Sequence, residues 1–515
     1  MSEALKNRPK DELISIIADQ EHLLSDKEQL LLIKQTEIEQ LNHQIKYFQK
    51  ILYGPKKETH KAMVNPSQGE LPFAEKVDLD LKQDEELMPI NYLRKKANRK
   101  RTDFSKLELP ADMEQVDIII EPENIPEGSV KIDEERTELL ACRPAKFYKK
   151  VIIRPIYGLP GGEGVIIGQL PSRIIPSGKV DESFLRMLII DKYIYHLPLY
   201  RQLIKYAQMG VKLSDSTVGD WTAKTIIMLG FLYDRLIVRI RGSSYLQADE
   251  TTVKVLDKNT KGKTHLGYYW VYHAVKEKVI VFNYQPGRDH GAPLELLEGF
   301  EGDLQTDGFS AYDTLIKKRD GINLVGCMAH SRRHYYDAQD YDNVKSVWML
   351  DKLQQLYAIE SIAREGNYTD DQRLALRQEK SVPILDEIKP WLDAQIANDG
   401  TTNPLTKALR YMSTRWEKLT QFSRDGKLEI DSNLIENAIR PVALGRRNWL
   451  FAGSTPAAQR GGVIYSLFAT CKLNGIDPDK WLLEVLQKLP DTKQSDLDSL
   501  LPLPENTHFA KIIQK

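Results

Sequence analysis

Cysteine is scarce in this sequence, with Cys142, Cys327 and Cys471 far apart and no Cys-x-x-Cys pair among its 515 residues. A disulfide-built fold is therefore excluded, and the pattern is typical of a reducing cytosol. The first twenty residues lack the apolar core of a signal peptide. No apolar, uncharged run reaches the length of about 18 residues that a bilayer span needs. These absences predict a soluble, cytoplasmic protein without a membrane partner.

A large net charge is also missing, because 72 basic and 73 acidic residues give −1 at pH 7. The overall balance thus gives no sign of a nucleic-acid partner, and only local clusters of charge can do so. The hydrophobic fraction of 41% and the charged fraction of 28% are those of a globular protein. The length predicts about three or four domains.

The N-terminal region, residues 1–55, is predicted to be a coiled-coil oligomerisation helix that ends at Gly54-Pro55. Apolar residues recur every seven positions at Ile17, Leu24, Leu31, Ile38, Ile45 and Leu52. The d positions of the same heptads are polar in the middle of the segment. They are Leu13, Gln20, Lys27, Lys34, Leu41 and Phe48. A single amphipathic helix lying on its own protein is the alternative.

Residues 56–112 are interpreted as a linker, acidic first and then basic. Six of its eight residues from position 94 are positively charged: Arg94, Lys95, Lys96, Arg99, Lys100 and Arg101. Such a cluster can neutralise DNA phosphates and release counterions. A solvated run of charge is the alternative.

Two small modules are expected next, a β-rich one at 113–180 and a helix-turn-helix-like one at 181–235. In the second, Gly210 can end one helix, and Ser214 or Ser216 can cap the next. That second helix would present Thr217 and Lys224 to DNA. A helix pair without a role in DNA reading is the alternative.

Residues 236–340 alternate with the period of strands, and two aspartates stand out there. Asp249 shares one strand face with Gln247 and Thr251, whereas Glu250 points the other way. Asp307 ends a later β run. If the two strands lie parallel and adjacent, about 4.8 Å apart, both carboxylates can hold divalent metal ions. Chance also places many aspartates near strand ends.

Glu436 opens a stretch that contains no other acid before Asp477 but is rich in arginine, including Arg440, Arg446 and Arg447. This combination suits a site for metal and phosphodiester together. A structural alternative is a capping box, with Asn433 as N-cap and Glu436 three residues later. Trp449 and Phe451 could stack on an unpaired base, although burial of both in the core is favoured.

The chain resembles the DDE transposases of the insertion-sequence 66 family over nearly its whole length. The resemblance is carried, in order, by HLPLYRQLIKYAQMGVKLSDSTVGDW (196–221), LQADETTVKVL (246–256), LQTDGFSAYD (304–313), CMAHSRRHYYDA (327–338), EIDSNLIENAIRPVALGRRNWLFAGS (429–454) and KLNGIDPDKWLLEVL (472–486). It implies that Asp249, Asp307 and Glu436 are catalytic and hold two Mg²⁺ ions, with Mn²⁺ able to substitute.

The fold implied is multidomain α+β, with an RNase H-like mixed α/β catalytic core. The core would comprise residues 236–340 and 426–465, interrupted by an all-helical insertion at 341–425 and followed by a helical C-terminal segment at 466–515, whose end we expect to be loosely attached. Family members carry paired zinc-finger cysteines in the β-rich region, but only Cys142 lies there. Cys327 and His330 resemble a Cys-x2-His element, for which we favour a structural role.

The expected function is a transposase that cuts the ends of an insertion sequence and joins them to target DNA. Its partners would be the element's terminal repeats, target DNA, further copies of the chain, and small companion proteins of the same element. It would be nucleoid-associated when bound to DNA. Two alternatives remain: a catalytically silent DNA-binding regulator derived from a transposase, and a Mg²⁺-dependent nuclease or resolvase that cuts without joining.

Overall fold

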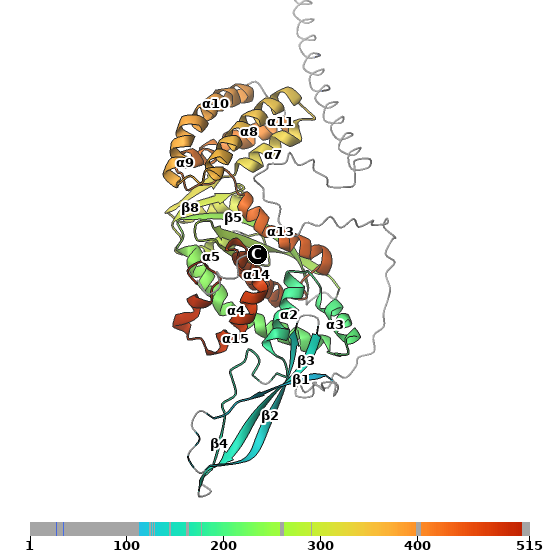
Figure 1. Cartoon of the computed structure of the whole chain (residues 1–515). Helices are drawn as coiled ribbons and strands as arrows, with labels where there is room; N and C mark the ends of the chain where they lie inside the picture. Colours follow the sequence, from blue (N-terminus) through green and yellow to red (C-terminus); the bar gives the residue numbers. More distant parts are fainter. Residues whose placement is uncertain are drawn as a thin grey trace, which may run out of the picture. The chain divides into compact units, whose positions relative to one another are not determined.

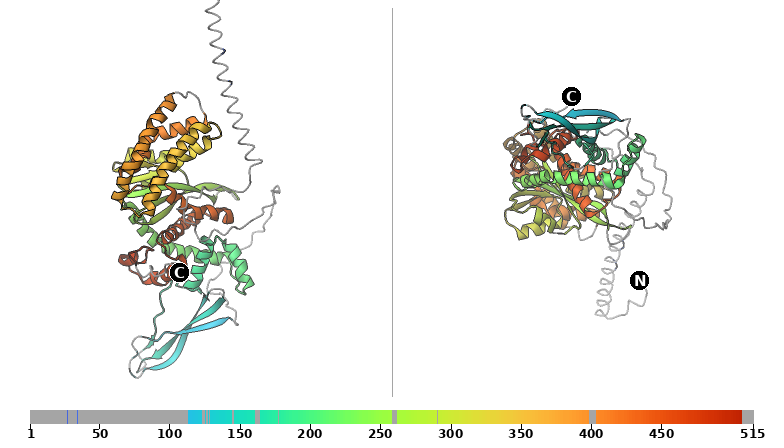
Figure 2. Two further views of the ribbon diagram at one scale, coloured as in Figure 1. Left: turned by 45° about the horizontal axis from the view of Figure 1, so that its top comes forward. Right: turned by 90° about the horizontal axis from the view of Figure 1, so that it is seen from below.

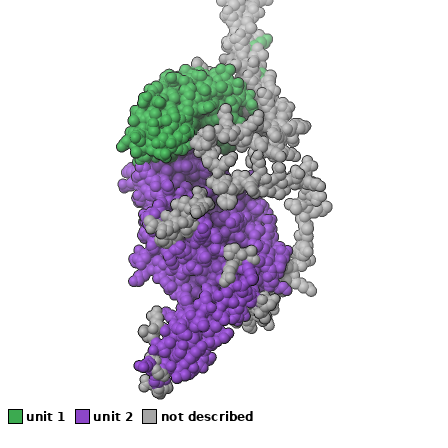
Figure 3. Space-filling view, in the orientation of Figure 1, with its two compact units in different colours: residues 1–91, 328–430 green, residues 92–327, 431–515 purple. Residues whose placement is uncertain are grey.

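The computed structural model describes residues 113–506, apart from short gaps at 123–124, 126, 128, 144–145, 161–163, 177, 258–261, 290 and 398–402, together with Lys27 and Lys34. The predicted coiled coil and the basic cluster at 94–101 therefore lie outside the described residues. The chain divides into two compact units, Met1–Asn91 with Met328–Ile430, and Tyr92–Cys327 with Asp431–Lys515 (Figure 3). We call the described parts the helical unit (328–430) and the core unit (113–327 and 431–506).

The core unit begins with a small sheet, as the β-rich pattern predicts. Its strands are β1 (Glu114–Ile119), β2 (Val130–Arg143), β3 (Lys146–Gly158) and β4 (Val165–Ile167). The strand β3 is central and pairs parallel with β1 and antiparallel with β2 and β4. The long strands β2 and β3 run side by side in Figure 2. Phe147 of β3 packs against Phe184 of the first helix that follows, which joins this sheet to the main core.

Three helices follow, α2 (Glu182–Tyr193), α3 (Leu199–Gln208) and α4 (Asp215–Arg241). The turn between α3 and α4 is as predicted: Gly210 adopts a φ of 86°, and Ser214 caps α4 by accepting from the N–H of Thr217. However, α4 is 27 residues long and buries a face that includes Trp221, Leu229 and Leu236. Most of this helix therefore serves the core.

The main sheet has five strands in the order β7-β6-β5-β8-β9. Their bounds are β5 (Tyr245–Leu256), β6 (Thr264–Ala274), β7 (Val279–Gln285), β8 (Gly302–Thr306) and β9 (Ile322–Gly326). The first three form the expected antiparallel meander, whereas β8 pairs parallel with both β5 and β9. The helices α5 (Gly291–Leu296) and α6 (Ser310–Lys318) connect the later strands.

The C-terminal helices α13 (Asn433–Trp449), α14 (Thr455–Leu473) and α15 (Pro478–Lys488) complete the core unit (Figure 1). The outward N–H groups of Ile280 and Phe282 on the edge strand β7 donate to Thr470 and Ser466 of α14. A helix that caps an edge strand in this way prevents pairing with another chain. A side chain at Gly462 would meet the carbonyl oxygen of Phe282, so glycine allows this close approach.

The chain after α15 contradicts the expectation of a loosely attached end. The short 3₁₀ turns η6 (Leu489–Asp491) and η7 (Gln494–Leu500) follow α15. Leu500, Leu501 and Leu503 are buried, and the indole N–H of Trp481 donates to the carbonyl of Leu500. The prolines interrupt helix there without preventing the leucines from packing. The last part of the expected loose end, residues 507–515, lies outside the described residues.

The helical unit is built as the sequence predicts, from helices alone. Its elements are α7 (Met328–Ala338), α8 (Asn343–Glu365), α9 (Asp370–Leu376), the π turn η4 (Arg377–Ser381), α10 (Val382–Ala397), α11 (Pro404–Thr414), α12 (Trp416–Leu419) and η5 (Gln421–Arg424). It includes α7 and so begins earlier than the expected residue 341. The N–H of Met328 donates to the carbonyl of Ile430, which joins the unit's first and last residues.

The guanidinium of Arg377 lies at the centre of the helical unit. It is fully buried and bonds both carboxylate oxygens of Glu360, which is itself buried. Its remaining N–H groups donate to the carbonyls of Phe422, Asp425 and Leu428. All five donors of the side chain are thus used. One buried ion pair therefore ties η4 to α8 and to the unit's C-terminal turn.

In the part of the chain that the structure describes, no helix is both long enough and apolar enough to cross a bilayer.

Candidate carboxylate site

Asp249 lies on β5, and Asp307 directly follows the adjacent parallel strand β8. The strands β5 and β8 pair with Gln247 opposite Gln305, and Asp249 and Asp307 each lie two residues further along. The pairing ends at Gln247 and Gln305, so both aspartates lie just beyond the paired part of the two strands. Side chains two residues apart on a strand share a face. The strands β5 and β8 are therefore parallel and adjacent, which is the arrangement that the predicted metal site requires.

A buried network of amides lies beside the aspartates on the same face. The amide nitrogen of Gln247 donates to Oε1 of Gln305 at 2.9 Å and to the carbonyl of Asp431 at 2.9 Å. Gln305 donates in turn to the carbonyl of Gly326, and the Tyr245 hydroxyl donates to Gln305. Just beyond Asp431, the N–H of Ser432 donates to Sγ of Cys327. These bonds fix the start of α13 against the sheet.

Glu436 lies in the first turn of α13 and is exposed. The capping-box alternative is wrong: the N-cap is Ser432, without a side-chain cap bond, and Asn433 is already helical. The Asn433 side chain donates instead to Asp431, because the turn before the helix places that carboxylate beside it. The local explanation for Glu436 therefore does not hold.

Electrostatics show that the three acids share one neighbourhood. Burial raises the pKa of Asp249 to about 7, although the N–H of Glu250 donates to its carboxylate at 2.7 Å and acts in the opposite direction. The negative charges of Glu250, Asp307 and Glu436 raise it further. Like charges disfavour further ionisation, so this group of carboxylates carries an electrostatic cost that a cation would relieve.

That cost leads to a prediction about pH. The folded-state pKa of Asp249 lies above its unfolded value, so the ionised form is destabilising, and stability is lost as pH rises from about 4 to about 7. In EDTA, Asp249→Asn should therefore gain about 1 kcal/mol or more of stability relative to wild type between about pH 4 and pH 7, and keep this advantage at pH 8.5. Thermal melts across this range would measure the difference. A pH-independent difference would contradict the assignment.

Carboxylate oxygens are the ligands that Mg²⁺ prefers, and this ion is usually held by one or two carboxylates together with substrate phosphate. The described residues contain no group of three His, Cys, Asp or Glu side chains placed to hold one ion. Pairs of carboxylates that share Asp249 remain compatible with that finding. The donor chemistry and the raised pKa of Asp249 therefore fit a divalent cation.

The basic side chains of α13 differ in what they contact. Arg440 and Arg447 are exposed on the helix that carries Glu436. Arg446 instead bonds the hydroxyl and the carbonyl of Thr252 on β5, and burial lowers its pKa. Arg446 thus anchors α13 to the sheet, whereas Arg440 and Arg447 are available to a ligand.

The aromatic residues after these arginines were expected to be buried. Trp449 is partly buried and packs against the core, in agreement with that expectation. For Phe451 the expectation is wrong, because the chain leaves α13 through Leu450 at a φ of 59° and leaves Phe451 39% exposed.

The other candidates are placed as follows. Thr217 is tied to the Ser214 cap, and Lys224 forms an exposed ion pair with Asp220 on α4. Cys142 is buried beside Ser183 and Met187. The His334 ring packs against Tyr411 in the helical unit. Gln247 and Arg288, which carry contacts around the aspartates, were not among the predicted site residues. For Gln247 a signal existed, since it shares the strand face of Asp249.

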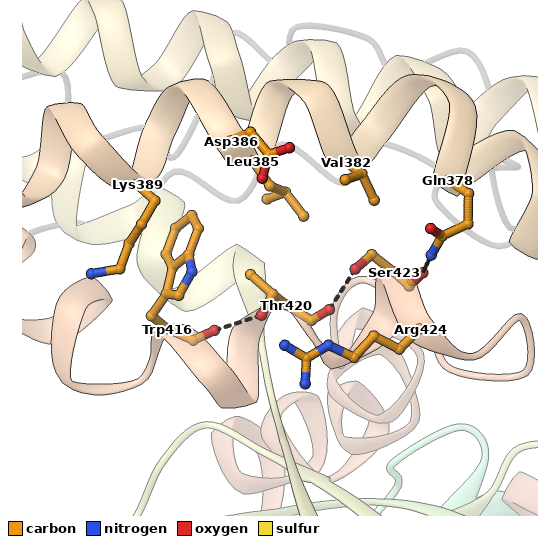
Figure 4. Close-up of a pocket in the computed structure, with 9 residues that line it drawn as sticks. All are labelled: Gln378, Val382, Leu385, Asp386, Lys389, Trp416, Thr420, Ser423 and Arg424. Carbon is orange, nitrogen blue, oxygen red and sulfur yellow. Dashed lines mark hydrogen bonds between the residues drawn. The ribbon is translucent and has the colours of Figure 1, made fainter.

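A separate hollow of about 310 Å³ lies in the helical unit (Figure 4). Gln378, Leu385 and Lys389 line it from one side and Trp416, Thr420 and Ser423 from the other. Gln378 donates to the carbonyl of Ser423 across it. No candidate acid or arginine lines this hollow, so it is not part of the carboxylate site.

Comparison with known proteins gives three family matches. Residues 177–460, which include all three acids, match "Transposase IS66 family". Residues 466–503 match "IS66 C-terminal element". Residues 40–118 match "Transposase C of IS166 homeodomain" and include the basic cluster at 94–101. Together these matches cover most of the chain.

Relatives in Sinorhizobium fredii (strain NBRC 101917 / NGR234) align over similar lengths. "Uncharacterized protein y4qI" is 32% identical over 479 residues, covering 89% of this chain and 87% of that protein. "Uncharacterized protein y4jD" is 32% identical over 417 residues, covering 76% and 81% respectively. No solved structure matches the chain.

Proposed function

Because the chain belongs to the IS66 family of transposases, we propose that it cuts the ends of an insertion sequence and joins them to target DNA at Asp249, Asp307 and Glu436. A transposase role and DNA as partner follow from the family and from the homeodomain-type match. The proposal adds the reaction, phosphodiester chemistry supported by two Mg²⁺ ions, and the three residues.

The observation that carries this proposal is the register of β5 and β8, combined with the charges that reach Asp249. Two acids from distant parts of the chain, Asp307 and Glu436, affect one buried carboxylate. A purely structural carboxylate would be expected beside a cation rather than beside other acids. The order of the sheet, with its first strand central between an antiparallel and a parallel neighbour, supports an RNase H-like core.

Each residue has a distinct role in the proposed reaction. Bound Mg²⁺, or Mn²⁺ in its place, would activate the attacking water or DNA 3′-hydroxyl and stabilise the leaving 3′-oxygen. The three carboxylates hold and charge-balance the cations, and Asp249 must lose its proton to do so. Arg440 and Arg447 would hold neighbouring phosphates. No serine or tyrosine nucleophile is required, because no covalent protein–DNA intermediate is proposed.

The roles of the arginines can be separated by the salt dependence of DNA binding. We expect Arg447→Ala to lower the slope of log K against log salt by about 1, since one phosphate contact is lost. Arg446→Ala is the matched control: it should leave the slope unchanged and lower the protein's stability, because its guanidinium bonds Thr252. Fluorescence anisotropy over 50–200 mM salt would measure both slopes. Equal slopes for the two variants would contradict these roles.

The proposed function is tested by incubating the purified chain with DNA that carries the element's ends, a target plasmid and Mg²⁺. We expect nicks at the element boundary and joined products, both dependent on Mg²⁺ and mapped on a sequencing gel. Nicks without joining would favour a nuclease or resolvase. Binding without nicks, even with the companion proteins added, would favour the catalytically silent regulator.

Transposition requires two element ends to be brought together, so we also propose a homo-oligomer. Removal of residues 1–53 should reduce its size if the predicted coiled coil is responsible. Size-exclusion chromatography with light scattering would compare the truncated and complete chains, and an unchanged mass would contradict the role of this segment.

A further inference from the structure

An arginine outside the three acids contacts both chain segments that carry the aspartates. Arg288 follows β7, and its Nε donates to Oε1 of Glu250 at 2.8 Å. Its Nη2 bonds the same oxygen. The Glu250 side chain is only 4% exposed, so this ion pair is well shielded on one side. Glu250 directly follows Asp249, and its backbone N–H donates to that carboxylate at 2.7 Å.

The same guanidinium stacks on the segment that carries Asp307. The central carbon of the Arg288 guanidinium lies 3.8 Å from the centre of the Phe309 ring. Trp270 contacts this ring as well, with 6.1 Å between the ring centres. The backbone N–H of Phe309 donates to Oδ1 of Asp307 at 2.8 Å, which closes a tight turn around the carboxylate. On each segment, Arg288 therefore contacts the residue whose backbone N–H donates to the aspartate.

Resting on the function proposed above, we propose that Arg288 is a positioning residue that holds the Asp249–Glu250 segment against the Asp307–Phe309 turn and so sets the separation of the two aspartates. The stacked and doubly bonded guanidinium is planar and rigid, so it restrains two segments that the sheet does not pair beyond Gln247 and Gln305. Lysine could supply the charge but neither the stack nor the fork of two donors.

Positioning and charge balance predict opposite changes in metal affinity. Loss of a cation beside Glu250 and Asp307 makes the site more negative, which by itself would tighten binding of a divalent ion. Loss of the contacts from Arg288 to Glu250 and Phe309 would let the two aspartates move. Both carboxylates would then bind the divalent ion more weakly. The direction of the change in affinity therefore separates the two roles without reference to catalysis.

The test uses the complete chain with Arg288→Ala, Arg288→Lys and a matched control, Arg235→Ala. The Arg235 side chain, on α4, is 40% exposed, against 41% for Arg288. Two nitrogens of its guanidinium bond the Asp498 carboxylate. Binding of Mn²⁺ is measured by electron paramagnetic resonance, and DNA nicking is measured at saturating Mg²⁺. Melting temperature and DNA affinity are measured alongside.

We expect Arg288→Ala to bind Mn²⁺ at least about threefold more weakly and to nick at least about tenfold more slowly, with Arg288→Lys only partly restored. Arg235→Ala should keep wild-type values in both assays. Phe309→Leu, which keeps the backbone bond to Asp307 but loses the stack, should show a smaller change in the same direction and serves if Arg288→Ala fails to fold.

Tighter Mn²⁺ binding with normal nicking in Arg288→Ala would overturn the proposal and leave Arg288 as a charge-balancing group. Equal losses in Arg288→Ala and Arg235→Ala would overturn it in favour of a general effect on stability. Wild-type protein that neither binds Mn²⁺ nor nicks DNA, with companion proteins present, would instead refute the proposed function on which the inference rests.

Discussion

Asp249→Ala protein is expected to bind the element's ends with near wild-type affinity but to cut them about a thousandfold more slowly or worse. A bound metal contributes several kcal/mol to stabilisation of the transition state, and each 1.4 kcal/mol is a factor of ten in rate. Asp249 is the acid whose pKa is influenced by both of the others, so its removal would leave the proposed metal site incomplete. Asp307→Ala and Glu436→Ala should lose activity to a similar extent.

The measurement is nicking and strand transfer on end-labelled DNA, with binding followed by anisotropy in the same buffer. Glu298→Ala is a suitable control, because this exposed carboxylate of the same unit precedes the start of β8, whereas Asp307 follows its end. Strand transfer at a normal rate by Asp307→Ala would show that the assignment of the three acids is wrong. Loss of DNA binding together with cutting would indicate misfolding.

Arg377→Ala is expected to destabilise the helical unit by about 3–5 kcal/mol, because it leaves the buried Glu360 carboxylate without its partner. Three backbone carbonyls would lose their donor as well. Replacement of both partners, Arg377→Met with Glu360→Leu, removes the unpaired charge and should recover most of this loss.

Hydrogen exchange of the amides in α8 and α10 measures this effect locally, which is appropriate because a chain of two units need not unfold in one step. Arg424→Ala is the matched control, since its ion pair with Glu417 is 59% and 76% exposed. Such exposed pairs contribute at most about 1 kcal/mol. Similar exchange rates in Arg377→Ala and Arg424→Ala would refute the central role of the buried pair.

The sequence predicted the features that depend on local pattern. The alternation around Asp249 and the β run that ends at Asp307 indicated two carboxylates that would meet if their strands were parallel and adjacent, because strand period is a local property. The helical insertion and the turn at Gly210 were predictable for the same reason. Glu436 could be connected to them only through the family resemblance, since nothing local relates α13 to β5.

The features that the sequence could not predict depend on contacts between distant segments. Arg288 lies in a connection after β7, and neither Glu250 nor Phe309 is near it in sequence. The capping box at Asn433 failed because the helix begins one residue earlier than that pattern requires, with Ser432 as its N-cap. The expected loose end failed because Leu500 and its neighbours find a partner in Trp481. In each of these cases, contacts with distant residues rather than local helix or loop propensity determined the structure.

The hydrogen bond between Met328 and Ile430 affects how the core unit assembles. A flexible loop of roughly 100 residues would cost about 4 kcal/mol in closure entropy before Glu436 could reach the sheet. Once the helical unit has folded, its two ends are already side by side, and the remaining connection is as short as a hairpin. The speed with which the third acid joins the first two should therefore follow the folding of the insertion, and a slow-folding insertion would delay the maturation of the whole site.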